Sequence, residues 1–223
     1  MLTVRNILSA DELAELLRGF ESGVFDDGAR TAVDAGRQVK NNLQMAPSPE
    51  RYRLGRIVSD ALARHRLFMQ YAIPRRIRPP SFSRYEVGME YGDHIDAPIM
   101  GQLKDNSLRT DLSVTLFLSE PASYDGGELS IQSPYGTRVV KLPPGQAVIY
   151  PSQSVHSVSP VTRGQRLAAI TRVESHVKRE DQRQLLFDLG RLISETPALR
   201  DDQSVYTRAT NVHARLVQMW AEN

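Results

Sequence analysis

Apolar residues recur at helical spacing in two segments of the N-terminal third of the chain. In residues 9–20 they fall on one helical face, and Ser9 followed by Glu12 is the pattern of a capping box. Residues 48–71 repeat the spacing, with Ser48 as the N-cap and Pro49 at the first helical position. The positions expected on the buried face of this second helix are Leu54, Ile57, Val58, Ala61, Leu62 and Leu67. Between the two helices, residues 38–45 predict a short strand.

From residue 77 to residue 176 the pattern changes to short runs rich in β-branched residues and separated by turn signals. The runs are SFSRYEVG, LSVTLFLS, ELSIQS, TRVVKLP, QAVIYPS, HSVSPV and RLAAITRVES. Glycines in YDGGE (124–128) and PYGT (134–137) mark chain reversals, because glycine accepts the positive φ that tight hairpins demand. Seven or eight short strands at this spacing predict an antiparallel sandwich or barrel, and the preceding helices would cover one outer face.

After His176 the helical spacing returns in residues 178–195 and 204–223. The apolar positions of these two segments are Leu185, Leu186, Leu189, Leu192 and Ile193 in the first, and Val205, Val212, Leu216 and Met219 in the second. We therefore divide the chain into a β-rich domain with N-terminal helices (1–177) and a C-terminal helical extension (178–223). The extension could form a homodimer interface, cover a pocket or complete the fold, and the sequence leaves these roles open.

The composition excludes several classes of protein. With 40% hydrophobic and 24% charged residues, the 223-residue chain has the composition of a globular protein rather than a disordered one. No apolar run approaches the roughly 18 residues of a membrane helix, and the first residues lack the pattern of a signal peptide. We therefore expect a cytoplasmic protein with no membrane partner. The absence of cysteine excludes disulfides, thiolate zinc sites and cysteine nucleophiles.

The basic segment PRRIRPP (74–80) raises the question of a nucleic-acid partner. It lacks interleaved aromatic residues, the net charge of the chain is only +2, and acidic residues are spread along the whole sequence. We therefore expect no nucleic-acid partner and interpret these arginines as surface or pocket-lining residues.

The segment YGDHIDAPIM (91–100) contains the first candidate chemistry. His94 and Asp96 are two residues apart, so on an extended strand both side chains point to the same face. His156 lies sixty residues after Asp96, in the last β-rich part of the chain. Two imidazoles and one carboxylate form the facial triad of non-haem Fe(II) oxygenases, which leaves coordination positions open for a co-substrate and O₂.

Arg166 follows His156 by ten residues, at the start of the next expected strand. A guanidinium at this place can bind a carboxylate through two hydrogen bonds. An iron oxygenase that uses 2-oxoglutarate needs such a group, because the distal carboxylate of the co-substrate must be anchored. The set of His94, Asp96, His156 and Arg166 therefore indicates a site for both iron and 2-oxoglutarate, although each member alone also fits a surface, core or turn position.

Several segments of the chain resemble the PKHD-type hydroxylases, a bacterial family in the prolyl 4-hydroxylase-like branch of the Fe(II)/2-oxoglutarate dioxygenases. The resemblance is carried by QVKNNLQM, RYEVGMEYGDHIDAPIM, RTDLSVTLFLSEPASYDGGELSIQ, YGTRVVKLPPGQAVIYPSQSVHSVSPVTRGQR and REDQRQLLFDL, so it covers almost the whole chain. It implies a double-stranded β-helix (jelly-roll) core, iron bound by His94, Asp96 and His156, and 2-oxoglutarate bound by Arg166. Ascorbate as auxiliary reductant is implied as well.

The resemblance extends to further residues less directly. Tyr85 lies where related enzymes use a tyrosine hydroxyl on the co-substrate, and core packing is the alternative. We interpret Leu129 as an apolar wall of the co-substrate pocket. Tyr91, Asn41 and Asn42 are candidates for the substrate side, with core packing or bonds to the backbone as alternatives.

The sequence thus predicts a dioxygenase that hydroxylates an unactivated C–H bond and releases succinate and CO₂. Its substrate, besides O₂, is an unidentified protein residue or small metabolite, and the resemblance suggests a link to bacterial iron uptake. Two other classes remain open: a non-catalytic β-barrel that senses iron or 2-oxoglutarate, and a metal hydrolase on a related barrel. A hydrolase has no need of the carboxylate anchor at Arg166.

Overall fold

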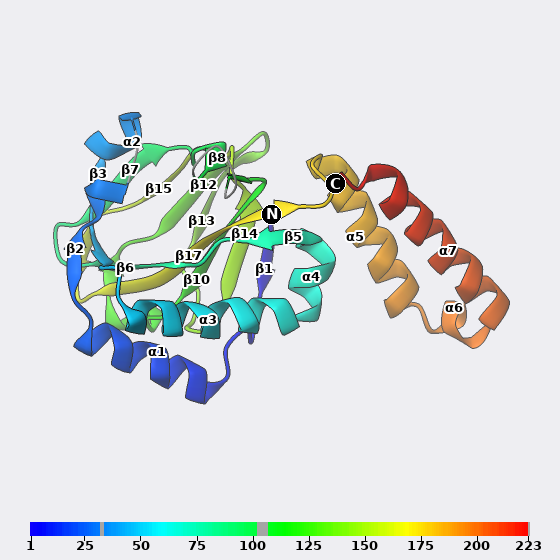
Figure 1. The fold of residues 1–223 in the computed structure, drawn as a ribbon, viewed down its shortest axis with the longest axis horizontal. Coiled ribbons are helices and arrows are strands. Elements are labelled where there is room, and N and C mark those ends of the chain that lie inside the picture. Colours follow the sequence, from blue (N-terminus) through cyan, green and yellow to red (C-terminus); the bar gives the residue numbers. More distant parts are fainter. Residues whose placement is uncertain (32–33, 102–106, 223) are drawn as a thin grey trace.

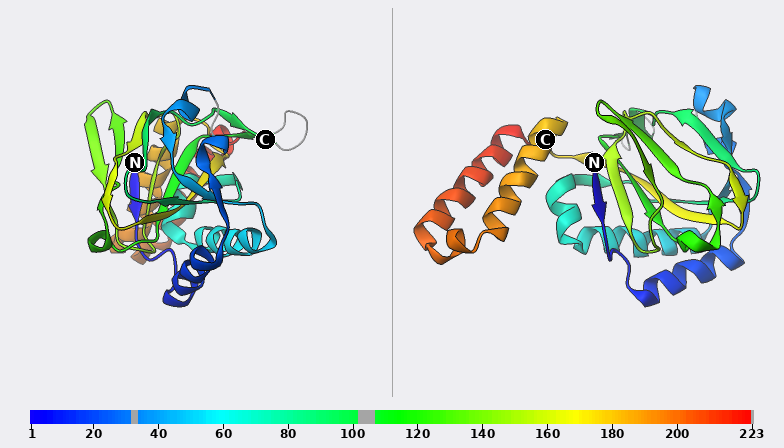
Figure 2. Two further views of the ribbon diagram at one scale, coloured as in Figure 1. Left: turned by 90° about the vertical axis from the view of Figure 1, so that its left-hand side faces the viewer. Right: turned by 180° about the vertical axis from the view of Figure 1, so that it is seen from behind.

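The computed structural model describes residues 1–31, 34–101 and 107–222 (Figure 1). Two antiparallel sheets face each other, and helices α1 (Ala10–Ser22) and α3 (Pro49–Arg64) run along the outer face of the larger sheet. The C-terminal helices project to one side of the sheets, which is clear in both Figure 1 and Figure 2. This arrangement agrees with the predicted β core between helices.

The larger sheet has eight strands within the described part of the chain. Their order is β1 (Leu2–Val4), β14 (Ala147–Pro151), β10 (Leu112–Phe117), β17 (Arg166–Ser175), β6 (Ser81–Tyr85), β4 (Leu43–Met45) and β2 (Phe25–Asp27), and β5 (Pro74–Ile77) pairs with β17. The smaller sheet runs β13 (Gly136–Val140), β12 (Leu129–Ser133), β15 (His156–Val158), β7 (Glu90–His94) and β3 (Lys40–Asn41). Two short pairs complete the strands: β11 (Asp125–Gly126) with β16 (Val161–Arg163), and β8 (Ile99–Met100) with β9 (Leu108–Arg109).

Alternating side chains of the larger sheet form two separate cores. On β14, Ala147 and Ile149 pack toward the helices, whereas Val148 and Tyr150 pack toward the smaller sheet. This follows from the two-residue period of a strand, which sends successive side chains to opposite faces. The second core, between the sheets, holds the candidate site at one end. The candidate site therefore lies inside the predicted sandwich.

The N-terminal helix begins as the sequence predicts. The Ser9 amide donates to Glu12 Oε2 at 2.9 Å and the Glu12 amide donates to Ser9 Oγ at 3.2 Å, which is a complete capping box. At the second helix, the Arg51 amide donates to Ser48 Oγ at 3.1 Å, and Pro49 occupies the first turn.

The single helix predicted for residues 48–71 is wrong in one respect, because the chain breaks it at His65. Helix α3 ends at Arg64, His65 is extended (ψ 111°), and α4 (Arg66–Ala72) begins after it. The His65 ring bonds through Nε2 with the Arg5 carbonyl at 3.0 Å. The break shifts the helical phase, so Leu67, which was expected on the buried face, is 37% exposed.

The strand predicted for residues 38–45 is two strands that belong to different sheets. β3 pairs with β7 in the smaller sheet, and β4 pairs with β6 in the larger one. Gln38 instead ends helix α2 (Asp34–Gln38). Asn42 lies between β3 and β4, where the chain crosses from one sheet to the other, and its side chain is buried.

The C-terminal extension consists of α5 (Glu180–Glu195), α6 (Pro197–Asp201) and α7 (Gln203–Trp220). Phe187 of α5 packs edge-on against Tyr71 of α4, with ring centroids 5.3 Å apart. Glu222 pairs with Arg109 at 2.8 Å. Helices α5 and α7 pack against each other in a single layer, so only one side of each is covered. Four of the predicted apolar positions are exposed: Leu185, Leu192, Val212 and Met219. The division of the chain at residue 177 stays a prediction.

Within the described residues, none of the helices combines the length and the apolar character needed to cross a membrane.

Candidate metal centre

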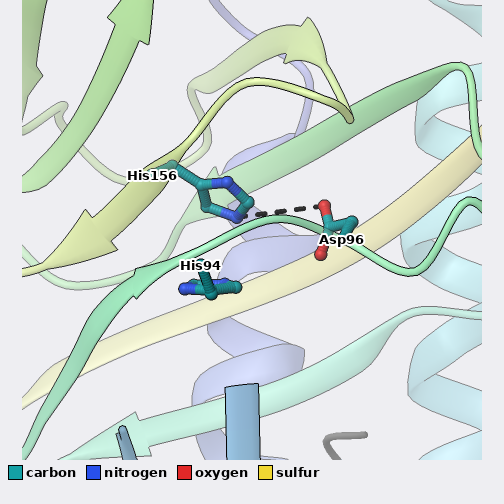
Figure 3. A group of neighbouring side chains, drawn as sticks. All are labelled: His94, Asp96 and His156. Carbon is teal, nitrogen blue, oxygen red and sulfur yellow. Dashed lines mark ion pairs between the residues drawn. The ribbon is translucent and has the colours of Figure 1, made fainter. Parts of the chain in front are cut away.

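His94, Asp96 and His156 converge at one end of the space between the sheets (Figure 3). One ligand atom from each lies within 4.8 Å of the others. His94 is the last residue of β7 and pairs in register with His156, the first residue of β15. Asp96 lies just past the end of β7, where its amide donates to the Ser152 carbonyl at 3.3 Å. Asp96 Oδ2 is 3.9 Å from His156 Nε2.

Both imidazoles are held with Nε2 free for a ligand. His94 Nδ1 is 2.8 Å from the Gly92 carbonyl, and His156 Nδ1 is 2.9 Å from the Ser154 carbonyl. A carbonyl oxygen only accepts, so each Nδ1 carries the proton and each Nε2 keeps its lone pair. Burial, followed by the neighbouring His156, lowers the pKa of His94 to about 4. Burial also lowers the pKa of His156. The neutral imidazoles are the forms that bind metal.

Arg172 and Ser113 hold the carboxylate of Asp96. Arg172 donates to Oδ1, Ser113 donates to Oδ2, and Ser113 Oγ is 2.9 Å from Ser152 Oγ. Burial alone would raise the pKa of the Asp96 carboxyl, but Arg172 and His156 outweigh it and keep this pKa below its ordinary value. Asp96 is therefore ionised at neutral pH with its oxygens in fixed directions.

Arg172 is a site residue that the sequence reasoning missed. It lies six residues after Arg166 on β17, and an even spacing places two side chains on the same face of a strand. That parity is a signal the sequence contains. Its partner Asp96 comes from a different segment, so the ion pair itself depends on the tertiary fold.

The side chain of Arg166 is enclosed in the protein near the three converging residues. It is 1% exposed, its Nε has no hydrogen-bond partner among the described residues, and it pairs in register with Tyr85 of β6. Its guanidinium carbon is 5.1 Å from the Tyr85 ring centroid and 5.3 Å from that of Phe117. A buried guanidinium between two rings with an unsatisfied donor is prepared for an anion.

One cavity of about 220 Å³ connects the three candidate ligands with the arginine. Its wall includes His94, Asp96, His156, Arg166, Tyr85 and Leu129. Leu129 is 2% exposed and belongs to the core between the sheets. The residues predicted for iron and for 2-oxoglutarate are therefore brought together around one cavity.

The three substrate-side candidates lie in different places. Tyr91 stacks on His94 with centroids 3.5 Å apart, and Asn42 lines the cavity. Asn41 is exposed, does not line the cavity, and donates to the Gly88 carbonyl at 3.3 Å. Tyr91 and His94 are three residues apart, which would place them on opposite faces of a regular strand. A register shift in the β7–β15 pair, where Val158 opposes Tyr91 and His156 opposes His94, brings them to the same side.

Comparison with known proteins agrees with this geometry. The profile of the 2OG-Fe(II) oxygenase superfamily matches residues 80–172, which include all three converging residues and Arg166. A PKHD-type hydroxylase of Stenotrophomonas maltophilia (strain K279a) is 41% identical over 223 residues, covering 100% of this chain and 99% of the relative. A PKHD-type hydroxylase of Thioalkalivibrio sulfidiphilus is 43% identical over 223 residues with the same coverage.

Solved structures share the fold. A prolyl hydroxylase from Trichoplax adhaerens, in complex with a hypoxia inducible factor peptide, has a TM-score of 0.56 at 17% identity, covering 82% of this chain and 86% of its own. A Pseudomonas putida prolyl-4-hydroxylase has a TM-score of 0.53 at 19% identity, covering 78% of this chain and 91% of its own. These likenesses confirm the jelly-roll core. With relatives 41–43% identical over its whole length, the chain belongs to the PKHD-type hydroxylase family of the 2OG-Fe(II) oxygenases and is an enzyme of the 2-oxoglutarate-dependent hydroxylase class.

Proposed function

We propose that this chain is an Fe(II)- and 2-oxoglutarate-dependent dioxygenase that hydroxylates an unactivated C–H bond of a substrate not yet identified. In this proposal His94, Asp96 and His156 bind the iron, and Arg166 binds the distal carboxylate of 2-oxoglutarate. The observation that carries it is the unsatisfied, buried guanidinium of Arg166 in the same cavity as the three converging residues.

The three residues fit a divalent iron ion by their chemistry. Two neutral imidazoles with free Nε2 atoms and one ionised carboxylate form the donor set of non-haem Fe(II) oxygenases. The carbonyls of Gly92 and Ser154 fix the ring orientations, which is the usual support for a histidine ligand.

Arg166 and its neighbours fit the co-substrate. A carboxylate beside Arg166 would pair the buried cation and satisfy its Nε donor, for which no described residue supplies a partner. The Tyr85 ring packs against the guanidinium, and Leu129 closes the cavity on an apolar side. Among the described residues that line the cavity, Asp96 is the one carboxylate, and Arg172 already pairs with it.

Iron together with 2-oxoglutarate and O₂ supplies hydroxylation coupled to release of succinate and CO₂. The residues of the chain orient the co-substrate and the Asp96 carboxylate, and they enclose the site. Arg166 fixes the position of the co-substrate through its distal carboxylate, and Arg172 and Ser113 fix the direction of the Asp96 oxygens. The buried wall around Leu129 and Val158 limits the access of water.

The proposal is tested anaerobically with Fe(II) and 2-oxoglutarate. We expect a metal-to-ligand absorption band in the wild-type protein and succinate on admission of O₂. Arg166→Ala should weaken the apparent 2-oxoglutarate affinity at least tenfold while divalent metal still binds. Arg163→Ala is the matched control, because Arg163 lies three residues earlier, is exposed and pairs with Asp125 at 2.6 Å.

Each outcome of this test has a distinct meaning. Absence of the band in the wild-type protein contradicts the proposed iron and co-substrate site. A band without succinate indicates the non-catalytic sensor predicted as the alternative. Unchanged 2-oxoglutarate affinity in Arg166→Ala removes the assignment of the anchor.

Other expectations drawn from the sequence stay predictions. They are ascorbate as auxiliary reductant, a link to iron uptake, a homodimer, a cytoplasmic location and the absence of a nucleic-acid partner.

A further inference from the structure

The wall of the candidate cavity carries an excess of positive charge. The described residues that line it include five cationic side chains and one carboxylate: Lys40, Arg51, Arg78, Arg166, Arg172 and Asp96. Two of these cations have assigned partners, since Arg172 pairs with Asp96 and Arg166 is assigned to 2-oxoglutarate. Lys40, Arg51 and Arg78 remain, and none of the three forms an ion pair with a carboxylate of the described residues.

Of these three cations, Arg78 is the best placed to bind an anion. Its amide donates to the Arg172 carbonyl at 2.9 Å, so it lies beside the residue that pairs with Asp96. Its guanidinium is half-buried and makes no hydrogen bond or ion pair to the described residues. Burial, and then the charges of Arg172 and Arg51, lower the pKa of Arg78. Like charges held this close repel one another, and an anion between them would relieve the repulsion.

Arg51 and Lys40 also line the cavity wall. Arg51, in the first turn of α3, donates to the Met45 carbonyl at 3.3 Å. Lys40, on β3, donates to Thr31 Oγ1 at 2.8 Å and lies 5.2 Å above the Tyr91 ring centroid. Both side chains are half-buried and bond to neutral groups only among the described residues. Neither cation is therefore neutralised by a carboxylate, although burial lowers the pKa of Lys40 to about 8, so its charge is available to a ligand below that pH.

Two neighbouring arginines contrast with Arg78. Arg75 and Arg76, from the same basic segment as Arg78, are exposed and pair with Glu174, Arg75 at 3.4 Å. The segment PRRIRPP thus divides into two neutralised surface arginines and one cavity arginine without a carboxylate partner.

We propose that the primary substrate carries an oxyanionic group, a carboxylate or a phosphate, that binds to Arg78 and Arg51 with Lys40 nearby. Its reacting C–H bond would then lie at His94, Asp96 and His156, in the same cavity. Two guanidinium groups favour oxyanions because their planar donors match carboxylate and phosphate oxygens. This inference rests on the proposed function, since it places the substrate beside the iron and co-substrate.

The test uses the full chain loaded with Mn(II), in place of Fe(II), and one equivalent of 2-oxoglutarate. Inorganic phosphate and propionate serve as separate probes, followed by ³¹P and ¹H nuclear relaxation. Bound Mn(II) accelerates the relaxation of a probe that binds close to it. We expect saturable acceleration for at least one probe, and the stronger probe identifies the favoured oxyanion. Arg78→Gln should raise the dissociation constant of that probe at least fivefold.

Two further variants control for misfolding and for general charge. Arg51→Gln removes a second cation from a different element and should also weaken the probe. Arg75→Gln removes an equal charge three residues from Arg78 and should leave the dissociation constant unchanged. If neither probe binds, or if Arg78→Gln and Arg51→Gln both bind as the wild type does, the oxyanion site is disproved.

The Fe(II)–2-oxoglutarate absorption band, measured on the same wild-type preparation, separates the two proposals. A normal band with no probe binding removes the oxyanion inference and leaves the proposed function intact. A missing band contradicts the proposed function and, with it, the assignment of any bound oxyanion as substrate.

Discussion

His94 is an imidazole whose surroundings change the pH at which the site can bind metal. With an ordinary pKa of 6.5, proton competition would begin to weaken metal binding below about pH 6.5. Burial and His156 lower the pKa of His94 to about 4, so the proton competes only at lower pH. Asp96 stays ionised in the same range, because its pKa is also lowered. We therefore expect the Mn(II) dissociation constant to be nearly constant from pH 7 to about pH 5.5.

Titration calorimetry at four or five pH values measures this dissociation constant. A tenfold weakening per pH unit that starts at 6.5 would contradict the lowered pKa. His156→Ala provides the control, because it removes one proposed ligand and should weaken Mn(II) binding at every pH.

Arg172 balances a buried charge in the protein without metal. Its side chain is 13% exposed and that of Asp96 is 6% exposed, so removing the arginine leaves a buried carboxylate with fewer partners. Loss of one partner of a buried ion pair typically costs about 3 kcal/mol. We expect Arg172→Met to lower the free energy of unfolding by about this amount, and saturating Mn(II) to restore part of it by pairing with Asp96.

Urea unfolding with and without Mn(II) distinguishes this from a general packing defect. The exposed pair Arg179–Asp181 is the matched control, and Arg179→Met should change the free energy of unfolding by less than about 1 kcal/mol. A loss in Arg172→Met that Mn(II) does not reduce would show that the arginine acts through packing alone.

The sequence was informative about ligands and less so about the residues that support them. The convergence of His94, Asp96, His156 and Arg166 around one cavity could be predicted because their spacing matches one known arrangement, and their roles as ligands stay a prediction. The stacking of Tyr91 on His94 could not be predicted, since it depends on a register shift between two strands that are more than sixty residues apart in the chain.

At the scale of elements, periodicity predicts where a helix or strand lies but not where the chain changes direction within it. Residues 38–45 look like one strand because residues 40–41 and 43–45 are both extended, whereas the chain passes from the smaller to the larger sheet at Asn42. The apolar spacing of residues 48–71 likewise continues across His65, although the backbone there is extended. Which partner each half meets is decided by long-range packing.

An aromatic contact between Phe187 and Tyr71 is one of the contacts that attach helix α5 to the rest of the molecule. Phe187 is 4% exposed and its ring meets Tyr71 of α4 at an interplanar angle of 86°. Truncating a buried phenylalanine typically costs 3–5 kcal/mol, so Phe187→Ala should lower the free energy of unfolding by about 3 kcal/mol in urea. Leu185→Ala, at a position that is 52% exposed on the same helix, should change it by less than about 0.5 kcal/mol. Equal effects of the two variants would show that Phe187 does not anchor the extension.

For the whole molecule, the alternation of short strands and turns was sufficient to predict a β sandwich covered by helices. The central strands of the larger sheet are buried on both faces, as in β10, where all six residues are buried. That pattern reflects a sheet between helices on one side and a second sheet on the other. The order of the strands could not be predicted, because neighbours such as β6 and β17 are about eighty residues apart in the chain.

The candidate metal site joins parts of the molecule that are distant in the sequence, so metal should stabilise the fold as a whole. The proposed ligands come from β7, the segment after it and β15, and Asp96 is tied to β10 through Ser113 and to β17 through Arg172. A metal that binds only the folded state contributes about 2.7 kcal/mol at a hundredfold excess over its dissociation constant. For a chain of this size that corresponds to a rise in Tm of roughly 5 to 10 °C.

Scanning calorimetry with and without Mn(II) measures this rise in Tm. In His156→Ala the rise should fall to a small fraction of the wild-type value, because one of the three proposed ligands is gone. His176→Ala should keep it, since His176 lies outside the converging group. If both variants respond to Mn(II) as the wild type does, the metal binds elsewhere. If both lose the response, histidine replacement disturbs the fold. Only loss confined to His156→Ala places the stabilising metal at the junction of β7 and β15.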